Sequence, residues 1–199
     1  MPPRVVFLPG ASGAAEFWAP VADRMPEGWQ TRLLSFPGAG VEPHDPMING
    51  YSDLMGWTAT VVTDGSDVVA QSMGGAVAMG VALAYPRKIR RLVLVATSGG
   101  VDIARLGGED WRAEYAAEFA DAAPWVTSHH VDHSPDLRRV KTPTCLIWGD
   151  DDPISPLAVG RALDRALPCS GLHVVRGGTH MLARERPGEV AKLIVEHLS

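Results

Sequence analysis

The sequence predicts an α/β fold, with about six mainly parallel strands flanked by helices in a single domain. Short apolar runs without polar alternation recur along the chain, and strands buried on both faces have this composition. Segments with helical spacing separate these runs, as in a doubly wound parallel sheet. The length of 199 residues suits one sizeable core better than two. We therefore expect one domain over residues 1–199, with a short cap insertion at about 98–143.

The predicted strands and helices alternate from the N-terminus onward. The apolar runs expected to form strands are residues 5–8, 31–36, 67–70, 92–96, 144–148 and 172–175. The segments with helical spacing are residues 15–25, 51–62, 73–85, 156–167 and 187–198. Pro156 and Pro187 open the last two helices, because a first-turn residue needs no amide proton. Pro86 ends the helix that begins at Met73.

Residues 98–143 form the longest interruption of this alternation. The segment contains a helical candidate at 109–121, in which Trp111, Tyr115 and Phe119 recur every fourth residue and share one face. That face could dock an ordinary helix on the sheet or support a lid over a substrate pocket. Both interpretations remain open. Residues 127–135 are polar and are expected to form a loop.

Composition excludes several classes of function. The chain has 18 Lys and Arg against 23 Asp and Glu, a formal net charge of −5, and its basic residues are scattered. A nucleic-acid or anionic-membrane partner is therefore not expected. The sequence has no apolar run of about 18 residues that would span a membrane and no signal-peptide pattern, so we expect a cytoplasmic protein.

No cofactor or metal is expected. Cys145 and Cys169 form neither a disulfide framework nor a metal-ligand spacing. His129, His130 and His133 lie close together, but no cysteine or carboxylate stands at a convincing ligand spacing beside them. These histidines are interpreted as part of a solvated loop.

A candidate nucleophile stands where a buried strand meets a helix. Residues 68–75 read Val-Val-Ala-Gln-Ser-Met-Gly-Gly, so that the strand ends at Ser72 and the helix begins at once. A sharp turn of this kind needs small residues two places before and after the serine, and Ala70 and Gly74 occupy those places. The alternative is that Ser72 only caps the helix.

Two further segments place acidic and basic groups after neighbouring strands. Asp150, Asp151 and Asp152 follow one apolar run, and His180 follows the next. The carboxyl ends of parallel strands lie at one edge of the sheet, where ligands bind in open α/β folds. We therefore expect these groups to lie near Ser72.

Together these motifs resemble the α/β-hydrolase family over nearly the whole chain, in its compact, short-cap group of esterases and thioesterases. The resemblance implies a catalytic triad of Ser72, Asp152 and His180, in the family's chain order. Asp152 stands three residues beyond a glycine and four before a proline, as the family acid does, and Asp150 and Asp151 are fallback candidates. Ala70 departs from the pattern by replacing the usual glycine.

The first strand is followed by a loop that resembles the family's oxyanion loop, although Pro9 replaces the usual histidine. The resemblance implies an oxyanion hole made by the backbone amides of Ala11 and Met73. The residues considered as lining the substrate pocket are Ser12, Trp18, His44, Gln71 and Ser98. For two of them another interpretation is open: Trp18 as an anchor of the first helix in the core, and Gln71 as a strand-end residue bonded to the backbone.

The predicted function is a serine hydrolase that acts, through an acyl-enzyme, on a carboxylic ester or thioester of a small to medium acyl group. The partner is a small-molecule substrate, and the oligomeric state stays open. Two alternatives also stay open. One is a C–C bond or lactone hydrolase, or a lyase, with the same triad, and the other is a non-catalytic ligand-binding homologue.

Overall fold

The computed structural model describes residues 3–199, which form one six-stranded sheet in the order β2-β1-β3-β4-β5-β6. All neighbouring strands are parallel. The predicted fold class is therefore confirmed. The strands are Arg4–Leu8 (β1), Gln30–Leu33 (β2), Ser66–Gln71 (β3), Ile89–Val95 (β4), Thr144–Gly149 (β5) and Ser170–Val175 (β6).

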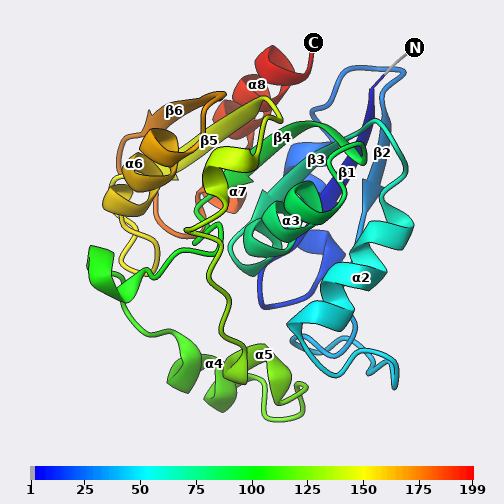
Figure 1. Ribbon diagram of the computed structural model, residues 1–199, viewed down its shortest axis with the longest axis vertical. Helices are drawn as coiled ribbons and strands as arrows, with labels where there is room; N and C mark the ends of the chain where they lie inside the picture. The colour runs from blue at the N-terminus through cyan, green and yellow to red at the C-terminus, as the bar shows by residue number, and fades with distance from the viewer. Residues whose placement is uncertain (1–2) are drawn as a thin grey trace.

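Helices cover both faces of the sheet (Figure 1). On one face lie α2, α3 and α6, and on the other α1, α7 and α8. The α-helices are Ala19–Ala22 (α1), Tyr51–Val61 (α2), Met73–Ala84 (α3), Arg112–Glu118 (α4), Trp125–Ser128 (α5), Leu157–Ala166 (α6), Leu182–Glu185 (α7) and Pro187–Leu198 (α8). Short 3-10 helices are formed by Ala15–Trp18 (η1), Ala104–Leu106 (η2) and Leu137–Arg139 (η3).

The core is divided by the sheet into two layers. In β1, Val6 and Leu8 pack in the layer of α2, α3 and α6, whereas Val5 and Phe7 pack in the layer of α1 and α8. Successive side chains of a strand point to opposite faces, so a strand covered on both sides must be apolar throughout. The edge strands β2 and β6 are more exposed, because each has a neighbour on one side only.

Two predicted elements are shorter than the sequence pattern suggested. The predicted helix at 15–25 is a 3-10 turn followed by the four-residue α1. Pro20, in the first turn of α1, has no amide proton with which to continue a helical ladder from the preceding turn. The predicted strand at 31–36 ends at Leu33, and the amide of Phe36 bonds instead to the carbonyl of Gly13.

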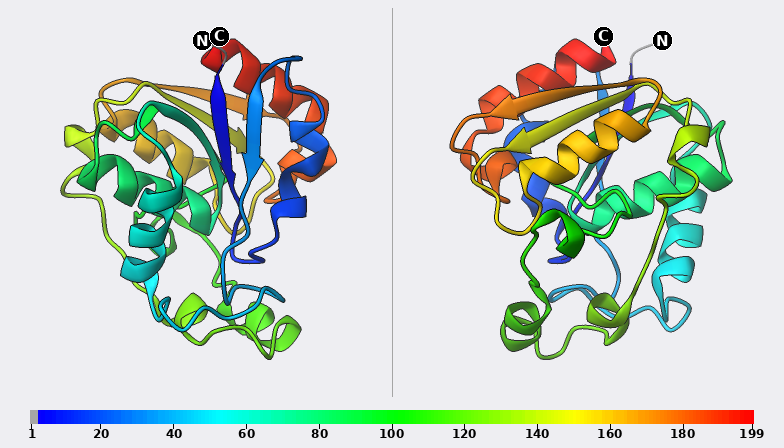
Figure 2. Two further views of the ribbon diagram at one scale, coloured as in Figure 1. Left: turned by 90° about the vertical axis from the view of Figure 1, so that its right-hand side faces the viewer. Right: turned by 60° about the vertical axis from the view of Figure 1, so that its left-hand side comes forward.

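Residues 98–143, here called the insertion, connect β4 to β5 at the end of the molecule toward which β1 and β2 run (Figure 2). The helix predicted at 109–121 is confined to α4, and the aromatic rings of Trp111, Tyr115 and Phe119 do pack in sequence, with centroids 5.4 and 4.9 Å apart. Within residues 3–199 the helices are all too short or too polar to cross a membrane.

Candidate active site

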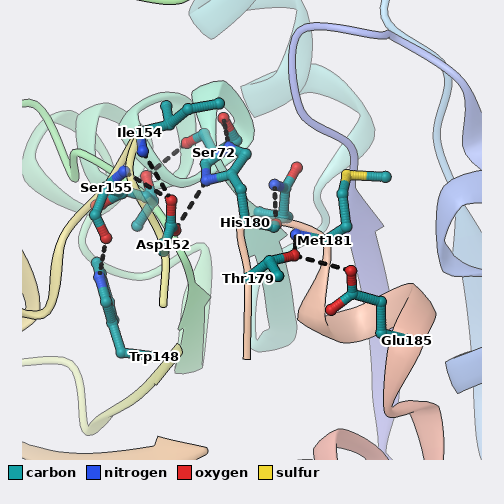
Figure 3. A network of polar contacts seen from close by, with 11 residues as sticks. Ser72, Trp148, Asp152, Ile154, Ser155, Thr179, His180, Met181 and Glu185 are labelled. Carbon is teal, nitrogen blue, oxygen red and sulfur yellow. Dashed lines mark hydrogen bonds and ion pairs between the residues drawn. The ribbon is translucent and has the colours of Figure 1, made fainter. Parts of the chain in front are cut away.

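Ser72, Asp152 and His180 meet at the carboxyl edge of the sheet (Figure 3). Ser72 joins β3 to α3, Asp152 follows β5, and His180 follows β6. The Nε2 atom of His180 lies 3.0 Å from the Ser72 hydroxyl oxygen, and its Nδ1 atom lies 2.9 Å from Oδ2 of Asp152. A hydroxyl, an imidazole and a carboxylate thus form one continuous series of hydrogen bonds.

The backbone of Ser72 has φ of 50° and ψ of −123°, a conformation that side chains rarely adopt. Its amide donates to the Val95 carbonyl at 3.2 Å, and its carbonyl accepts the amide of Gly75 at 3.0 Å. The turn also requires Gly74, because a Cβ atom there would lie 2.3 Å from the carbonyl oxygen of Pro9. These contacts force the Ser72 hydroxyl out of the strand and toward His180.

Asp152 is held by its own turn. Its Oδ1 atom accepts the backbone amides of Ile154 and Ser155, both at 2.9 Å, which leaves Oδ2 for His180. The side chain is fully buried. Of the two fallback candidates, Asp150 accepts the amide of Gly177 instead, and Asp151 is exposed. Asp152 is therefore the aspartate that faces the imidazole.

Close backbone packing brings the acid and histidine turns together. A Cβ atom on Gly149 would lie 1.9 Å from the carbonyl oxygen of Gly178, so only glycine fits at the end of β5. On the other side, the buried Gln71 donates from Nε2 to the carbonyl of His180 at 3.3 Å. The side chain of Gln71 thus helps to hold the turn that carries His180.

The backbone amides of Ala11 and Met73 have no hydrogen-bond acceptor among the described residues. Met73 is the first residue of α3, where a helix leaves its amides without internal partners. Within residues 3–199, neither its amide nor that of Ala11 donates a hydrogen bond to another protein group. Both amides can therefore donate a hydrogen bond to a ligand.

A cleft of about 880 Å³ opens at Ser72 and His180 and extends between α3, the insertion and α6. This volume lies in the upper part of the range of ligand pockets. Its apolar walls include Met73, Val101, Ile103, Leu106, Trp111, Val131, Leu137 and Ile154. Apart from His180, its charged and imidazole side chains all come from the insertion and are Asp102, Arg105, Arg112, His129, His130 and Asp132.

Of the residues considered for the pocket, Ser98 lines this cleft and Ser12 does not. Of the two interpretations of Trp18, the core anchor agrees with the structure, because Trp18 is fully buried and its indole Nε1 donates to the Leu8 carbonyl at 2.8 Å. His44 is exposed and pairs with the carbonyl of Asp121 at 2.9 Å. Gln71 bonds to the carbonyl of His180 and does not line the cleft.

The expectation of a solvated histidine loop is wrong for His129 and His133. The Tyr51 hydroxyl donates to the Ala76 carbonyl at 2.7 Å and lies 2.9 Å from Nε2 of His133, and the His129 ring stacks on Tyr51 at 5.9 Å. Burial raises the pKa of Tyr51 and lowers those of both histidines. The spacing of the histidines gave no signal of this contact, because Tyr51 is distant in sequence.

The residues described offer no metal centre. Across residues 3–199, no group of three or more His, Cys, Asp or Glu side chains is arranged to hold a metal ion.

Comparison with known proteins gives one family. The sequence model described as the alpha/beta hydrolase family matches residues 5–193. The 2-hydroxy-6-oxononadienedioate/2-hydroxy-6-oxononatrienedioate hydrolase of Cupriavidus pinatubonensis is 24% identical, over 96% of this chain and 83% of its own. The pimeloyl-[acyl-carrier protein] methyl ester esterase of Aromatoleum aromaticum is 32% identical, over 48% of this chain and 38% of its own.

Solved structures show the same fold. A hydrolase from Pseudomonas aeruginosa superimposes with a TM-score of 0.84 at 17% identity, and the match covers 100% of this chain and 90% of that one. The six parallel strands and the helices on both faces are thus an arrangement seen in hydrolases of low sequence identity.

Proposed function

The chain belongs to the alpha/beta hydrolase family, and on that premise we propose that it is a serine hydrolase acting on a carboxylic ester or thioester of a small to medium acyl group. The observation that carries the proposal is the hydrogen-bonded series from Ser72 through His180 to Asp152, with distances of 3.0 and 2.9 Å. A serine hydroxyl is a poor nucleophile near neutral pH, and an adjacent oriented base corrects this.

The reaction follows from these roles in two stages. His180 takes the hydroxyl proton of Ser72 as its oxygen attacks the acyl carbonyl, and then returns that proton to the leaving alcohol or thiol. The product is an acyl ester on Ser72. Water, deprotonated by His180, attacks this ester and releases the carboxylic acid, and the proton passes back to Ser72. Asp152 holds the imidazole with Nδ1 protonated and stabilises its cation.

The negative charge on the carbonyl oxygen is stabilised by the amides of Ala11 and Met73. Their lack of a protein acceptor within residues 3–199 supports this role. Loss of one such donor typically slows turnover by about 100-fold or more. Because backbone donors are independent of the side chains, Pro9 in place of the family histidine is compatible with it.

We also assign residues 1–199 to one domain in which the insertion at about 98–143 is a cap. The support is that the insertion supplies every charged side chain and several apolar ones in the wall of the cleft. The cleft volume of about 880 Å³ lies within the range of pockets that bind small molecules, which supports a small to medium acyl group.

A second candidate is C–C bond hydrolysis on the same triad. The observation in its favour is that a relative matched over 96% of this chain is named for such a substrate, a 2-hydroxy-6-oxo-dienedioate. The relative named as an ester esterase matches over 48% of the chain only. The triad geometry serves both reactions, because each needs an activated nucleophile and an oxyanion site.

The first experiment is stoichiometric labelling with a fluorophosphonate, measured by intact mass on the wild type and on Ser72→Ala. We expect one adduct per wild-type chain and none on the variant. A folded wild type that takes no adduct would contradict the serine-hydrolase proposal and favour a non-catalytic ligand-binding protein. Ser98→Ala is the matched control, because Ser98 lines the same cleft without a histidine partner within residues 3–199.

A substrate panel then separates the two candidates. p-Nitrophenyl esters and acyl thioesters of increasing chain length test the first, and a 2-hydroxy-6-oxo-dienedioate, followed by loss of its absorbance, tests the second. A kcat/KM higher for the dienedioate than for every ester would replace the ester proposal with C–C hydrolysis.

A further inference from the structure

We propose that Thr97 is a positioning residue, which fixes the turn of Ser72 and the turn of Asp152 relative to each other, because its hydroxyl donates to the first and its carbonyl accepts from the second. Thr97 follows the end of β4, the strand between those that carry Ser72 and Asp152. This inference rests on the proposed function, since it concerns the geometry of that reaction.

The hydroxyl of Thr97 acts on the nucleophile. It donates to the carbonyl oxygen of Ser72 and accepts the amide of Gly99 at 3.0 Å. The strained conformation of Ser72, with φ of 50°, persists only where several contacts impose it. The Thr97 bond joins those from Val95 and Gly75 in imposing it, and it is the one made by a side chain.

The carbonyl of Thr97 acts on the acid. It accepts the hydroxyl of Ser155 at 3.0 Å, and the Ser155 amide donates to Oδ1 of Asp152 at 2.9 Å. The Ser155 carbonyl in turn accepts the indole of Trp148 at 2.9 Å (Figure 3). Ser155 is thus attached to the strand edge on one side and to the catalytic carboxylate on the other.

Because both residues are buried, losing one of these hydrogen bonds should disturb the geometry of the site. Thr97 is fully buried and Ser155 is 1% exposed, so water cannot replace a bond that either one loses. The preceding residue, Ala96, has a positive φ of 45° and its amide bonds to the Ile147 carbonyl at 3.1 Å. The backbone therefore turns at the point where Thr97 can reach both neighbouring turns.

The decisive comparison is Thr97→Ala against Thr97→Ser, because these variants differ only in the hydroxyl oxygen. We expect Thr97→Ala to lower kcat for p-nitrophenyl butyrate, and the rate of fluorophosphonate labelling at Ser72, by about 10- to 100-fold with KM unchanged. Thr97→Ser should retain most of both rates. Equal rates in the two variants would overturn the proposal.

A matched pair separates positioning from stability. Thr144 is also a buried threonine in the sheet. It lies at the amino end of β5, opposite the candidate site, and its hydroxyl donates to the Thr142 carbonyl. Thr144→Ala should lower the melting temperature as Thr97→Ala does, yet leave kcat at the wild-type value. If Thr144→Ala slows labelling as much as Thr97→Ala, the effect is one of general stability and the proposal fails.

A double-mutant cycle tests whether one residue joins the two turns. Ser155→Ala breaks the bond to the Thr97 carbonyl and leaves the Ser155 amide on Asp152. If Thr97 couples the turns, the fold-losses in kcat of Thr97→Ala and Ser155→Ala should multiply to more than the loss in the double variant. Losses that simply multiply would contradict the coupling. Should Thr97→Ala fail to fold, Ser155→Ala alone tests the proposal. An unchanged kcat in Ser155→Ala would contradict the role of the Thr97 carbonyl in positioning the turn of Asp152.

These outcomes are distinct from failure of the proposed function. An unlabelled wild type refutes the serine-hydrolase proposal itself. A labelled wild type whose rate is the same in Thr97→Ala and Thr97→Ser refutes only the role of Thr97.

Discussion

Ser72 illustrates how a single residue is positioned by space as well as by hydrogen bonds. Helix α3 begins so close to the loop after β1 that the Cα of Gly74 faces the Pro9 carbonyl with no room for a methyl group. The same loop supplies the Ala11 amide proposed for the oxyanion hole. Contact at Gly74 therefore sets the distance between the nucleophile and one of its two proposed donors.

Gly74→Ala is expected to impair catalysis through this contact. A Cβ atom would lie 2.3 Å from the Pro9 oxygen and 3.0 Å from that of Leu8, so the loop or the helix must move. We expect a loss in kcat of about 100-fold, because displacements of about 1 Å have this effect. The measurement is steady-state hydrolysis of a p-nitrophenyl ester together with the melting temperature.

Gly56→Ala is the control for that substitution. Gly56 lies in α2 with no atom within 4 Å of the added Cβ, so alanine should raise stability by about 1 kcal/mol and leave kcat unchanged. Wild-type kcat in Gly74→Ala would show that the loop after β1 tolerates displacement, and would count against its proposed role in the oxyanion hole.

Single residues could be predicted from the sequence where a local pattern specifies them. Ser72 stands at a strand end between small residues, and Asp152 and His180 follow neighbouring strands. The role of Thr97 could not be predicted, since its bonds depend on segments distant in sequence, and Trp18 stayed open between the core and the cleft. Trp18 shows the limit clearly, because an aromatic residue beside a catalytic loop has the same local pattern whether it faces the cleft or the core.

At the scale of elements, the imidazoles of His129 and His133 join the insertion to Tyr51 of α2, whose hydroxyl in turn bonds to α3. Ala76 has only a carbonyl to offer, so the Tyr51 hydroxyl donates to it, and His133 therefore donates its Nε2 proton to Tyr51. Other charged groups act weakly here: Asp132 and Asp136 favour the charged form of His133, while Arg112 and His130 disfavour that of His129. Burial outweighs the two carboxylates, and both histidines have lowered pKa values.

These lowered pKa values predict that the insertion is docked less firmly in acid. The folded state binds protons at His129 and His133 less readily than the unfolded chain, whose histidines titrate near pH 6.5. Stability is therefore complete above about pH 6.5 and falls as the pH drops through the lower, folded-state pKa values. We expect the melting temperature to decrease between about pH 7.5 and about pH 5.

The variant His129→Gln/His133→Gln tests the source of this decrease. It should flatten the change of melting temperature over the same pH interval, with His197, whose pKa is also lowered by burial, left as a common background. The variant His173→Gln is the control, because His173 is exposed and lies on β6, outside the insertion. An unchanged slope in the double variant would mean that the insertion is not the acid-sensitive part.

Helices and strands could be predicted where a single pattern of apolar residues runs through the whole segment. The six strands follow from uniform apolar runs, and α2, α3, α6 and α8 from helical spacing, to within a few residues at their ends. The pattern failed at residues 15–25 and 109–121, where the apolar spacing continues beyond the helix. In both places the aromatic side chains pack on one another or on the core, and this packing needs no regular helix beneath it.

In the whole molecule, the two edges of the sheet have different roles. The carboxyl ends of the strands carry Ser72, Asp152, His180 and the cleft, whereas the amino ends carry a buried ion pair. Asp67, at the start of β3, is fully buried and accepts Nε of Arg90 at 2.9 Å and also its Nη2, while Arg90 remains 45% exposed. β3 therefore has a charged pair at one end and the nucleophile at the other.

This division predicts that stability and catalysis can be changed separately. Arg90→Ala leaves the Asp67 carboxylate buried without its partner, which should lower the free energy of unfolding by about 3 kcal/mol, the lower end for a buried pair because Arg90 is half exposed. The neighbouring Arg91→Ala, which loses only a bond to the Ser199 carbonyl, should change it by less than about 0.5 kcal/mol. Urea unfolding measures both free energies.

At temperatures well below its unfolding transition, Arg90→Ala should keep the wild-type kcat, since the bonds that join Thr97 with Ser72 and Ser155 at the carboxyl edge do not involve the amino end of β3. A fall in kcat that parallels the loss of stability would instead show that the sheet transmits strain along β3, and that the geometry at Ser72 depends on the whole strand rather than on the turn that follows it.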